Sequence, residues 1–225
     1  MLARFLCLAL VAGLGAAHVA SAAGAAIVQV TADGTSSVRP AWSPDGHRIA
    51  FQSSTKGVYR VYTMAADGSD RQTASQGDVD DRHPAWSPDS KTMYFSDSHA
   101  GAVWAYDFDP ATGGIANRRT FIDMTASGGV ADGATVDAEG CYWLTIPVTS
   151  KVCRYDPDGR LIETVVLPTD LPTCCEFGGK DLDVLYVTTA VLRRPAAHFA
   201  GQTAPGGLFA LDVGVKGLTL PPYAG

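Results

Sequence analysis

The segment Gly128-Gly129-Val130-Ala131-Asp132-Gly133 places one carboxylate between glycines and small residues. Glycine allows a backbone to approach a ligand or a channel axis closely. A carboxylate in that position can ligate a hard cation and can also accept a proton from water. The same letters are also typical of an Asp-Gly turn that carries no chemistry. The local pattern leaves both interpretations open for Asp132.

Other catalytic patterns are absent from the sequence. There is no G-x-S-x-G elbow, phosphate-binding loop or H-E-x-x-H pair. The cysteines after the N-terminal segment form no C-x-x-C pair, which argues against a zinc site made of thiolates. Cys174 and Cys175 are adjacent, as is typical of small buried residues on or near a strand. The sequence leaves a disulfide between Cys141 and Cys153 as an alternative.

A repeat organises the first part of the chain. The sequence Pro40-Ala41-Trp42-Ser43-Pro44-Asp45-Gly46 returns, 44 residues later, as Pro84-Ala85-Trp86-Ser87-Pro88-Asp89-Ser90. Such a period is typical of one propeller blade of four strands. Ser-Pro-Asp-Gly is turn chemistry, so we interpret Asp45 and Asp89 as turn residues and the two tryptophans as blade packing.

Strand-like alternation continues along the chain without sustained helical periodicity. The expected strands are 48–52, 58–62, 92–96, 102–106, 134–136, 141–146, 152–155, 161–167, 174–177, 184–189 and 207–211. We predict an all-β chain, a single β-propeller of five blades or slightly fewer, with an incomplete ring as the alternative. The apolar segment 26–30 has the composition of a strand that could complete the last blade and close the ring.

The net charge and the N-terminal residues limit where the protein can be located and which partners it can have. Residues 1–22 combine Arg4, an apolar run and Ala20-Ser21-Ala22, as in a secretory signal peptide cleaved after Ala22. We therefore expect a periplasmic or secreted protein with a mature domain over 23–225, and no membrane insertion, because no apolar run is long enough to span a bilayer. A net charge of -6 without a basic run argues against a nucleic-acid partner.

From about Trp86 onward the sequence resembles the senescence-marker-protein/gluconolactonase/regucalcin family. The resemblance rests on separated motifs: the Asp132 loop, 106–113 with 117–119, 136–140, 155–160, 177–179 and 206–217. The Trp42 repeat, over about 36–85, resembles the TolB-type propeller repeat instead. Family members close six blades, so the resemblance implies the C-terminal part of such a ring, preceded by one or two TolB-like repeats.

The resemblance also implies a site. In the family one divalent cation, held by Glu, Asn and Asp oxygens at the channel mouth, polarises a lactone carbonyl, and the Asp acts on the attacking water. Asp132 matches that Asp and is the predicted catalytic residue and metal ligand, with Ca²⁺ as the expected ion and Zn²⁺ or Mn²⁺ as substitutes. The family's Pro before it is Ala131 here.

Four further residues are auxiliary candidates, and they include the main departures from the family pattern. Arg82 stands where the family has its ligand Asn, and a guanidinium cannot ligate a cation. Asp81 could take that role only with a shifted strand register, and His83, at the family's Gly position, could bind zinc or simply be hydrogen-bonded. Asp97 either helps to order the site or caps a turn. The family's Glu ligand has no counterpart.

Two functions follow as expectations. The first is an exported, metal-dependent hydrolase of sugar lactones that acts through Asp132. The second is a non-catalytic TolB-like propeller that binds a protein or a small ligand at one face. Arg82 also suggests a variant of the first site, in which its charge replaces the cation and binds a carboxylate product.

Overall fold

The computed structural model describes residues 30–31, 35–55, 58–75, 82–191 and 194–220, together with the backbone of two N-terminal strands. The chain divides into two compact units, Met1–Thr35 and Ser36–Gly225. In the first unit β1 (Val19–Ala22) pairs antiparallel with β2 (Ala25–Val28). No helix among the described residues is long and apolar enough to cross a membrane.

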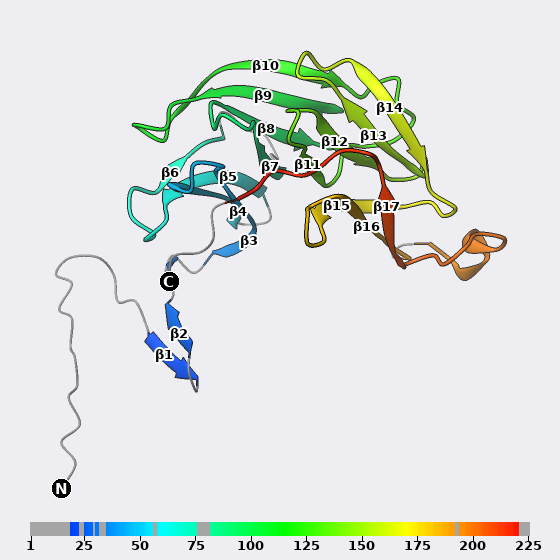
Figure 1. The fold of residues 1–225 in the computed structure, drawn as a ribbon, viewed down its shortest axis with the longest axis horizontal. Helices are drawn as coiled ribbons and strands as arrows, with labels where there is room; N and C mark the ends of the chain where they lie inside the picture. The colour runs from blue at the N-terminus through cyan, green and yellow to red at the C-terminus, as the bar shows by residue number, and fades with distance from the viewer. Residues whose placement is uncertain are drawn as a thin grey trace, which may run out of the picture. The chain divides into compact units, whose positions relative to one another are not determined.

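The second unit is a β-propeller of four antiparallel sheets, which Figure 1 shows following one another from β3 to β17. The first blade consists of β3 (Ser36–Trp42), β4 (Arg48–Thr55), β5 (Val58–Ala65) and β6 (Gln72–Thr73). The second blade consists of β7 (Arg82–Trp86), β8 (Thr92–Asp97), β9 (Ala102–Phe108) and β10 (Ile115–Asp123).

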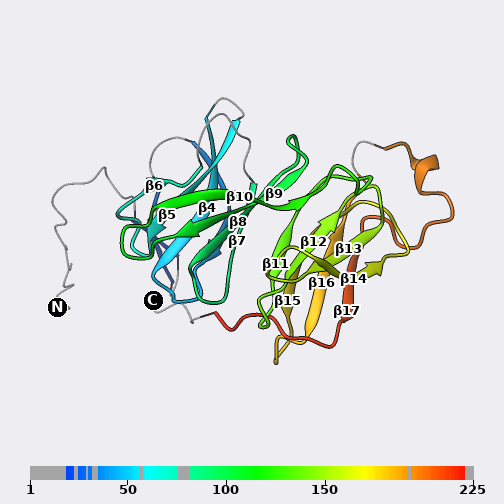
Figure 2. The ribbon, with the colours of Figure 1, turned by 90° about the horizontal axis from the view of Figure 1, so that it is seen from above.

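The last two blades continue the pattern. The third blade consists of β11 (Ala134–Val136), β12 (Tyr142–Ile146), β13 (Lys151–Tyr155) and β14 (Leu161–Val166). The fourth has three described strands, β15 (Pro172–Gly178), β16 (Val184–Thr189) and β17 (Leu208–Asp212), with the 3-10 turn η1 (Ala196–Phe199) before β17. Figure 2 shows these two blades beside each other. The predicted propeller is confirmed, with a blade count at the lower end of the expected range.

Most of segment 26–30 pairs within the first unit. Ala25–Val28 forms a hairpin with Val19–Ala22, in place of the last-blade strand that its composition suggested. The hairpin closes a very short loop, whereas closure of the ring would join strands about 180 positions apart, and the entropic cost of closing a loop grows with its length. Residues 1–18, most of the predicted signal peptide, lie outside the described residues.

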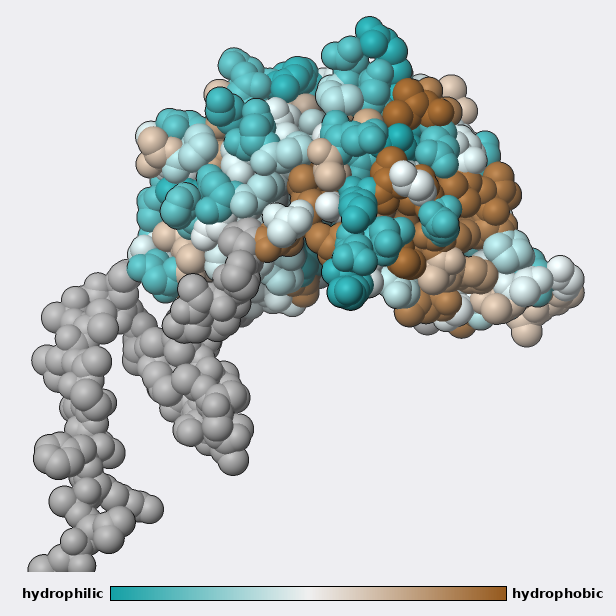
Figure 3. Space-filling view, viewed as in Figure 1, coloured by the Kyte–Doolittle hydropathy of each residue, from teal (hydrophilic) through white to brown (hydrophobic). Residues whose placement is uncertain are grey.

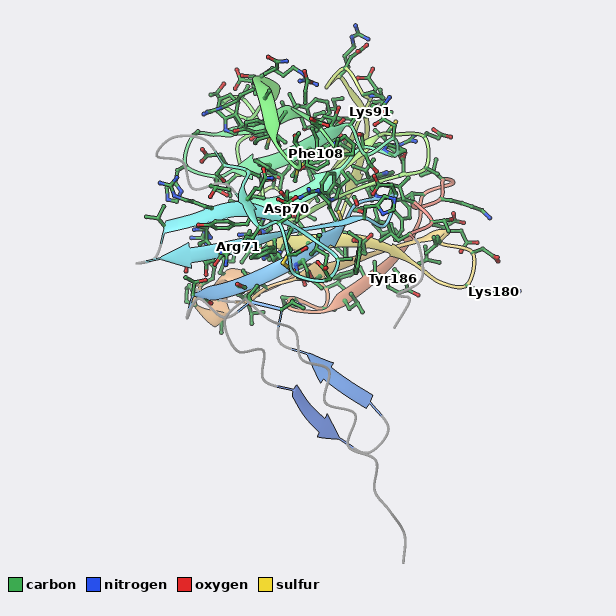
Figure 4. All side chains as sticks on the ribbon, turned by 90° about the vertical axis from the view of Figure 1, so that its left-hand side faces the viewer. Asp70, Arg71, Lys91, Phe108, Lys180 and Tyr186 are labelled. Atoms are coloured by element: carbon green, nitrogen blue, oxygen red, sulfur yellow. The ribbon has the colours of Figure 1, made fainter. Side chains whose placement is uncertain are left out.

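The core lies between the blades. Trp86 is 3% exposed, meets Phe108 edge-on at a centroid distance of 4.6 Å and donates from Nε1 to the carbonyl of Ala41 in the first blade. Phe108 is labelled in Figure 4. Trp86 therefore packs between neighbouring blades, as its repeated motif predicts. Trp143, on β12, is completely buried against the fourth blade.

Apolar side chains also remain on the surface of the last two blades. Figure 3 shows hydrophobic surface on the side of the molecule where β14 and β17 lie. The exposed residues there include Leu161, Ile162, Val166 and Leu208.

The innermost strands carry a repeated irregularity. In β3, β7 and β15 the register shifts within the first few residues. At or beside each shift a residue before proline takes a positive φ: Arg39 (55°), His83 (52°) and Leu171 (57°). A β-bulge of this kind removes a residue from the ladder and redirects its side chain. β3 contacts β7, and β11 contacts both β7 and β15, so these interrupted strands follow one another around the propeller.

Candidate active site at the channel mouth

The loop that carries Asp132 is held in place by the strands around it. The backbone N–H of Asp132 donates to the carbonyl of Thr145, and that of Gly133 donates to Thr173. Ser98 Oγ donates to the carbonyl of Ala131 at 2.7 Å, and Ser96 Oγ donates to that of Asp132 at 3.1 Å. Three blades thus fix the position of one carboxylate.

Gly133 is required by close packing. A Cβ on Gly133 would lie 2.6 Å from the Cα of Cys174 on β15, closer than side-chain atoms approach a backbone. The loop therefore lies directly against the fourth blade, and this contact depends on the missing side chain.

We expect Gly133→Ala to lower the free energy of unfolding by about 1–3 kcal/mol, because the new methyl group must displace backbone of β15. Any activity that depends on Asp132 should fall with it. Urea unfolding and a hydrolysis assay would measure both. Gly114→Ala is the matched control, because its methyl would meet only the Thr112 hydroxyl at 3.4 Å. Equal stability of the two variants would contradict the prediction.

His83 is the nearest side chain to the carboxylate. Its Nε2 lies 3.4 Å from Asp132 Oδ1, and the imidazole side chain is 6% exposed. The backbone N–H of His83 donates to Gln52 Oε1, while the ring Nδ1 is buried with no hydrogen-bond partner. Burial, followed by the positive charge of Arg39, lowers the pKa of His83 to about 3. The imidazole is therefore neutral at physiological pH.

Asp132 itself is an unusually basic carboxylate. Burial raises its pKa to about 6, and the charges of Arg39 and Arg82 partly oppose that rise. A carboxyl group is desolvated by burial in a low-dielectric site, which disfavours its charged form. The pKa places the group close to the range in which a general base works well near neutral pH.

Two guanidinium groups surround this pair. Arg39 extends from the bulge of β3, and its Nη1 lies 4.0 Å from Cys174 Sγ, next to Gly133. Arg82 starts β7, and its Cζ lies 4.9 Å from the centre of the Tyr59 ring. Both arginines act on the pKa values of Asp132 and His83 through their charge. The mouth thus combines one carboxylate, one neutral imidazole and two cations.

The other sequence candidates lie elsewhere or outside the description. Asp97 is 3% exposed, and its Oδ1 accepts from the backbone N–H groups of His99 and Ala100, as a turn cap does. Its neighbours Ser96 and Ser98, rather than Asp97, hold the Asp132 loop. Asp81 lies outside the described residues.

Neither Arg39 nor the role of Ser96 was predicted from the sequence. Arg39 precedes the first Pro-Ala-Trp motif as His83 precedes the second, so the repeat itself was the signal that could have found it. Ser96 carried no such signal, because its role depends on a contact between blades.

The described residues do not fit a calcium centre. Calcium takes six to eight oxygen ligands, whereas no group of three His, Cys, Asp or Glu side chains that could hold a metal occurs in the described ranges. Arg82 at the expected Asn position cannot ligate, and two guanidinium charges near Asp132 oppose a divalent cation. Cys141 and Cys153 are also unpaired thiols, and Cys153 lies opposite Leu144 in the ladder.

A carboxylate loop held by three blades of a β-propeller, with a buried imidazole beside it, defines the class: a β-propeller with a candidate acid–base site. Residues 83–191 match the model of the SMP-30/Gluconolactonase/LRE-like region. The matched residues include His83, Asp97 and Asp132, so this part of the chain is similar to that family.

Individual relatives agree with this assignment. Regucalcin of Danio rerio is 41% identical over 124 residues, which cover 54% of this chain and 41% of the relative. The crystal structure of a calcium-binding protein, regucalcin, from Agrobacterium tumefaciens has a TM-score of 0.74 at 28% identity, and covers 84% of this chain and 64% of that one. The chain spans about two fifths of the length of the curated regucalcins that it matches.

The chain is also similar in fold to another propeller. TolB from Acinetobacter baumannii has a TM-score of 0.56 at 21% identity, and covers 88% of this chain and 46% of that one. At this identity the likeness concerns the fold alone, in agreement with the propeller repeat recognised around Trp42.

Proposed function

We propose that the protein hydrolyses a lactone, with Asp132 as the general base. The observation that carries the proposal is the placement of Asp132: a largely buried carboxylate, fixed by three blades at the mouth of the channel, beside a neutral imidazole. The family region over 83–191, whose description includes gluconolactonase, supports the reaction class.

The chain's own residues supply the steps. Asp132 accepts a proton from water while the water oxygen attacks the carbonyl carbon and the carbonyl electrons move to oxygen. Arg39 and Arg82 place positive charge around this site, which stabilises the resulting oxyanion. When the tetrahedral intermediate collapses, the ring C–O bond breaks, and the proton held by Asp132 passes to the leaving alkoxide. The product is a hydroxy acid.

His83 is a positioning residue in this proposal. Its buried ring lies 3.4 Å from Asp132 Oδ1, and its neutral state means that it adds no charge to the carboxylate. The imidazole therefore restricts the movement of the Asp132 side chain. Because it is neutral, it does so without forming an ion pair.

The test is hydrolysis of a sugar δ-lactone by the full chain, in EDTA and separately with Ca²⁺, Zn²⁺ or Mn²⁺. We expect Asp132→Ala to reduce turnover by a factor of about 10²–10⁴, the usual contribution of general base catalysis. Asp158→Ala, an exposed acid on the turn after β13, is the matched control. Turnover equal in Asp132→Ala and the unchanged chain would overturn the proposal.

The comparison of EDTA with added metal ions tests whether hydrolysis needs a divalent cation, as the family resemblance implies. Because the described residues do not fit a calcium centre, we expect turnover to persist in EDTA. Strict dependence on a divalent ion would show that residues outside the described ranges, such as Asp81, complete a metal site.

The role of Asp132 as a base determines whether turnover rises or falls with pH. Asp132 must be ionised to accept a proton, and its pKa is about 6. We therefore expect kcat to rise with pH through about 6 and then level off. A profile that is flat between pH 5 and pH 7, or that falls, would contradict a role for Asp132 as the base.

A non-catalytic binding propeller is the second candidate, and one observation favours it. Arg39 and Arg82 give the mouth a positive field next to an uncharged imidazole, which suits retention of an anion. Under this candidate, a hydroxy acid such as gluconate binds in EDTA while no lactone is turned over. Calorimetric titration with gluconate separates the two candidates when it is combined with the hydrolysis assay.

Export is a further part of the proposal and is supported by residues 1–22 alone. Cleavage after Ala22 would give a mature N-terminus at Ala23. N-terminal sequencing of protein from the periplasmic or culture fraction would check it, and an intact Met1 in that fraction would contradict it.

A further inference from the structure

A pocket that does not include Asp132 lies between the innermost strands of the four blades. It has a volume of about 170 Å³, well above the space that one water molecule needs. All four innermost strands contribute to it, and Leu218 and Leu220 of the C-terminal segment add to its wall. Its remaining walls come mostly from proline, alanine and tryptophan, including Trp42 and Trp86.

One ionisable side chain lines this pocket. Glu176, on β15, has its Oε1 fixed by two hydrogen bonds, from Thr135 Oγ1 at 2.9 Å and from the backbone N–H of Phe177 at 3.0 Å. Throughout the described ranges no Lys, Arg or His pairs with Glu176, and no hydrogen bond reaches its Oε2. The carboxylate is therefore held rigidly, with one oxygen left for a ligand.

The surroundings of Glu176 favour a positive partner. Glu176 is exposed and lines the pocket, so its free oxygen is open to a ligand, while partial desolvation by its neighbours raises its pKa. A carboxylate that is desolvated without a cation is stabilised by any cation that enters. Aromatic side chains attract the same kind of ligand, since an ammonium group interacts favourably with the face of a tryptophan ring.

We propose that this pocket binds a small organic cation, an ammonium group on a compact aliphatic body. The ammonium group donates to Glu176 Oε2, while the aliphatic part packs against Trp42 and the prolines of β3 and β7. The site is chemically opposite to the channel mouth, where Arg39 and Arg82 favour anions. It does not depend on lactone hydrolysis, so failure of that proposal leaves this one unaffected.

The test is a titration of the full chain with n-butylammonium chloride, followed by tryptophan fluorescence at pH 8 and constant ionic strength. We expect saturable binding that is weakened roughly tenfold or more by Glu176→Gln, because a charge-assisted hydrogen bond is lost. 1-Butanol, which has a similar shape without the charge, should bind at least roughly tenfold more weakly than the amine. Trp42→Leu should also weaken the amine.

Two controls keep the result interpretable. Glu163→Gln makes the same change on β14, away from the pocket, and should leave amine binding as it is. Thermal unfolding of each variant shows whether it is folded, and Trp42→Leu tests the pocket independently of Glu176. Absence of saturation in the unchanged chain, equal affinity for 1-butanol, or undiminished affinity in Glu176→Gln would each overturn the proposal.

Discussion

Replacement of Asp137 by alanine is expected to lower the free energy of unfolding by about 3–5 kcal/mol, the usual cost of breaking a buried ion pair. Asp137 is completely buried. Its Oδ1 accepts from the backbone N–H groups of Glu139 and Cys141, and its Oδ2 accepts from Trp143 Nε1 and Arg154 Nε. Removal of this one carboxylate leaves a buried indole N–H without its partner, and leaves the largely buried guanidinium of Arg154 paired with the exposed carboxylate of Glu139 alone.

The same residue also holds the C-terminal segment. Asp137 forms an isolated antiparallel bridge with Gly217, and the N–H of Ala138 donates to the carbonyl of Lys216. Loss of the hydrogen bonds that Asp137 makes should therefore loosen both the third blade and the C-terminal segment that carries Leu218.

Urea unfolding at pH 7 measures the effect, with Asp158→Ala as the control acid on the next turn. The proposed cause has its own test. If the guanidinium that has lost its buried partner causes most of the loss, Arg154→Met in the Asp137→Ala background should recover part of the stability. A loss below about 1 kcal/mol in Asp137→Ala, or a further loss in the double variant, would contradict the argument.

Asp132→Asn is expected to have the opposite effect on stability, because the site holds a carboxylate where its charge is disfavoured. The pKa of Asp132 rises from 3.8 to about 6 on folding, so the folded chain binds the proton more tightly than the unfolded chain does. Stability from this group is therefore full below about pH 4 and is lost as the pH rises through about 6.

The size of this loss follows from the pKa difference. Each unit is worth about 1.4 kcal/mol, so the stability of the unchanged chain should fall relative to Asp132→Asn by up to about 3 kcal/mol between pH 4 and pH 7. Unfolding curves at several pH values would measure it, with Asp158→Asn as the control. A constant difference between Asp132→Asn and the unchanged chain across this range would show that the carboxylate is not destabilised by its site.

The sequence was sufficient to predict the strands whose burial alternates or which are fully buried, such as β12 and β16. It did not predict β10, Ile115–Asp123, because most of this outer strand is exposed and its polar residues show no apolar face. Nor did it predict β3 and β7, since each contains a proline, Pro40 or Pro84, which cannot donate to a strand ladder. In the structure those prolines lie at bulges, where a missing N–H is tolerated.

The candidate site was predictable only where the chemistry was local. The glycines around Asp132 indicated a loop in close contact with other backbone, and Gly133 against Cys174 is such a contact. The approach of His83 to Asp132 and the reach of Arg39 toward Cys174 depend on the order of blades around the channel. No pattern within a single blade contains that information.

The repeated bulge before proline has a consequence for how such a channel could change over evolutionary time. Arg39, His83 and Leu171 occupy corresponding places in three blades, at or beside the point where the ladder is already interrupted. A mutation there alters the chemistry of the mouth without breaking a strand pair. Each of these three blades thus has one position that can be exchanged without loss of strand pairing. New ligand preferences could arise by recombination of repeats while the scaffold stays the same.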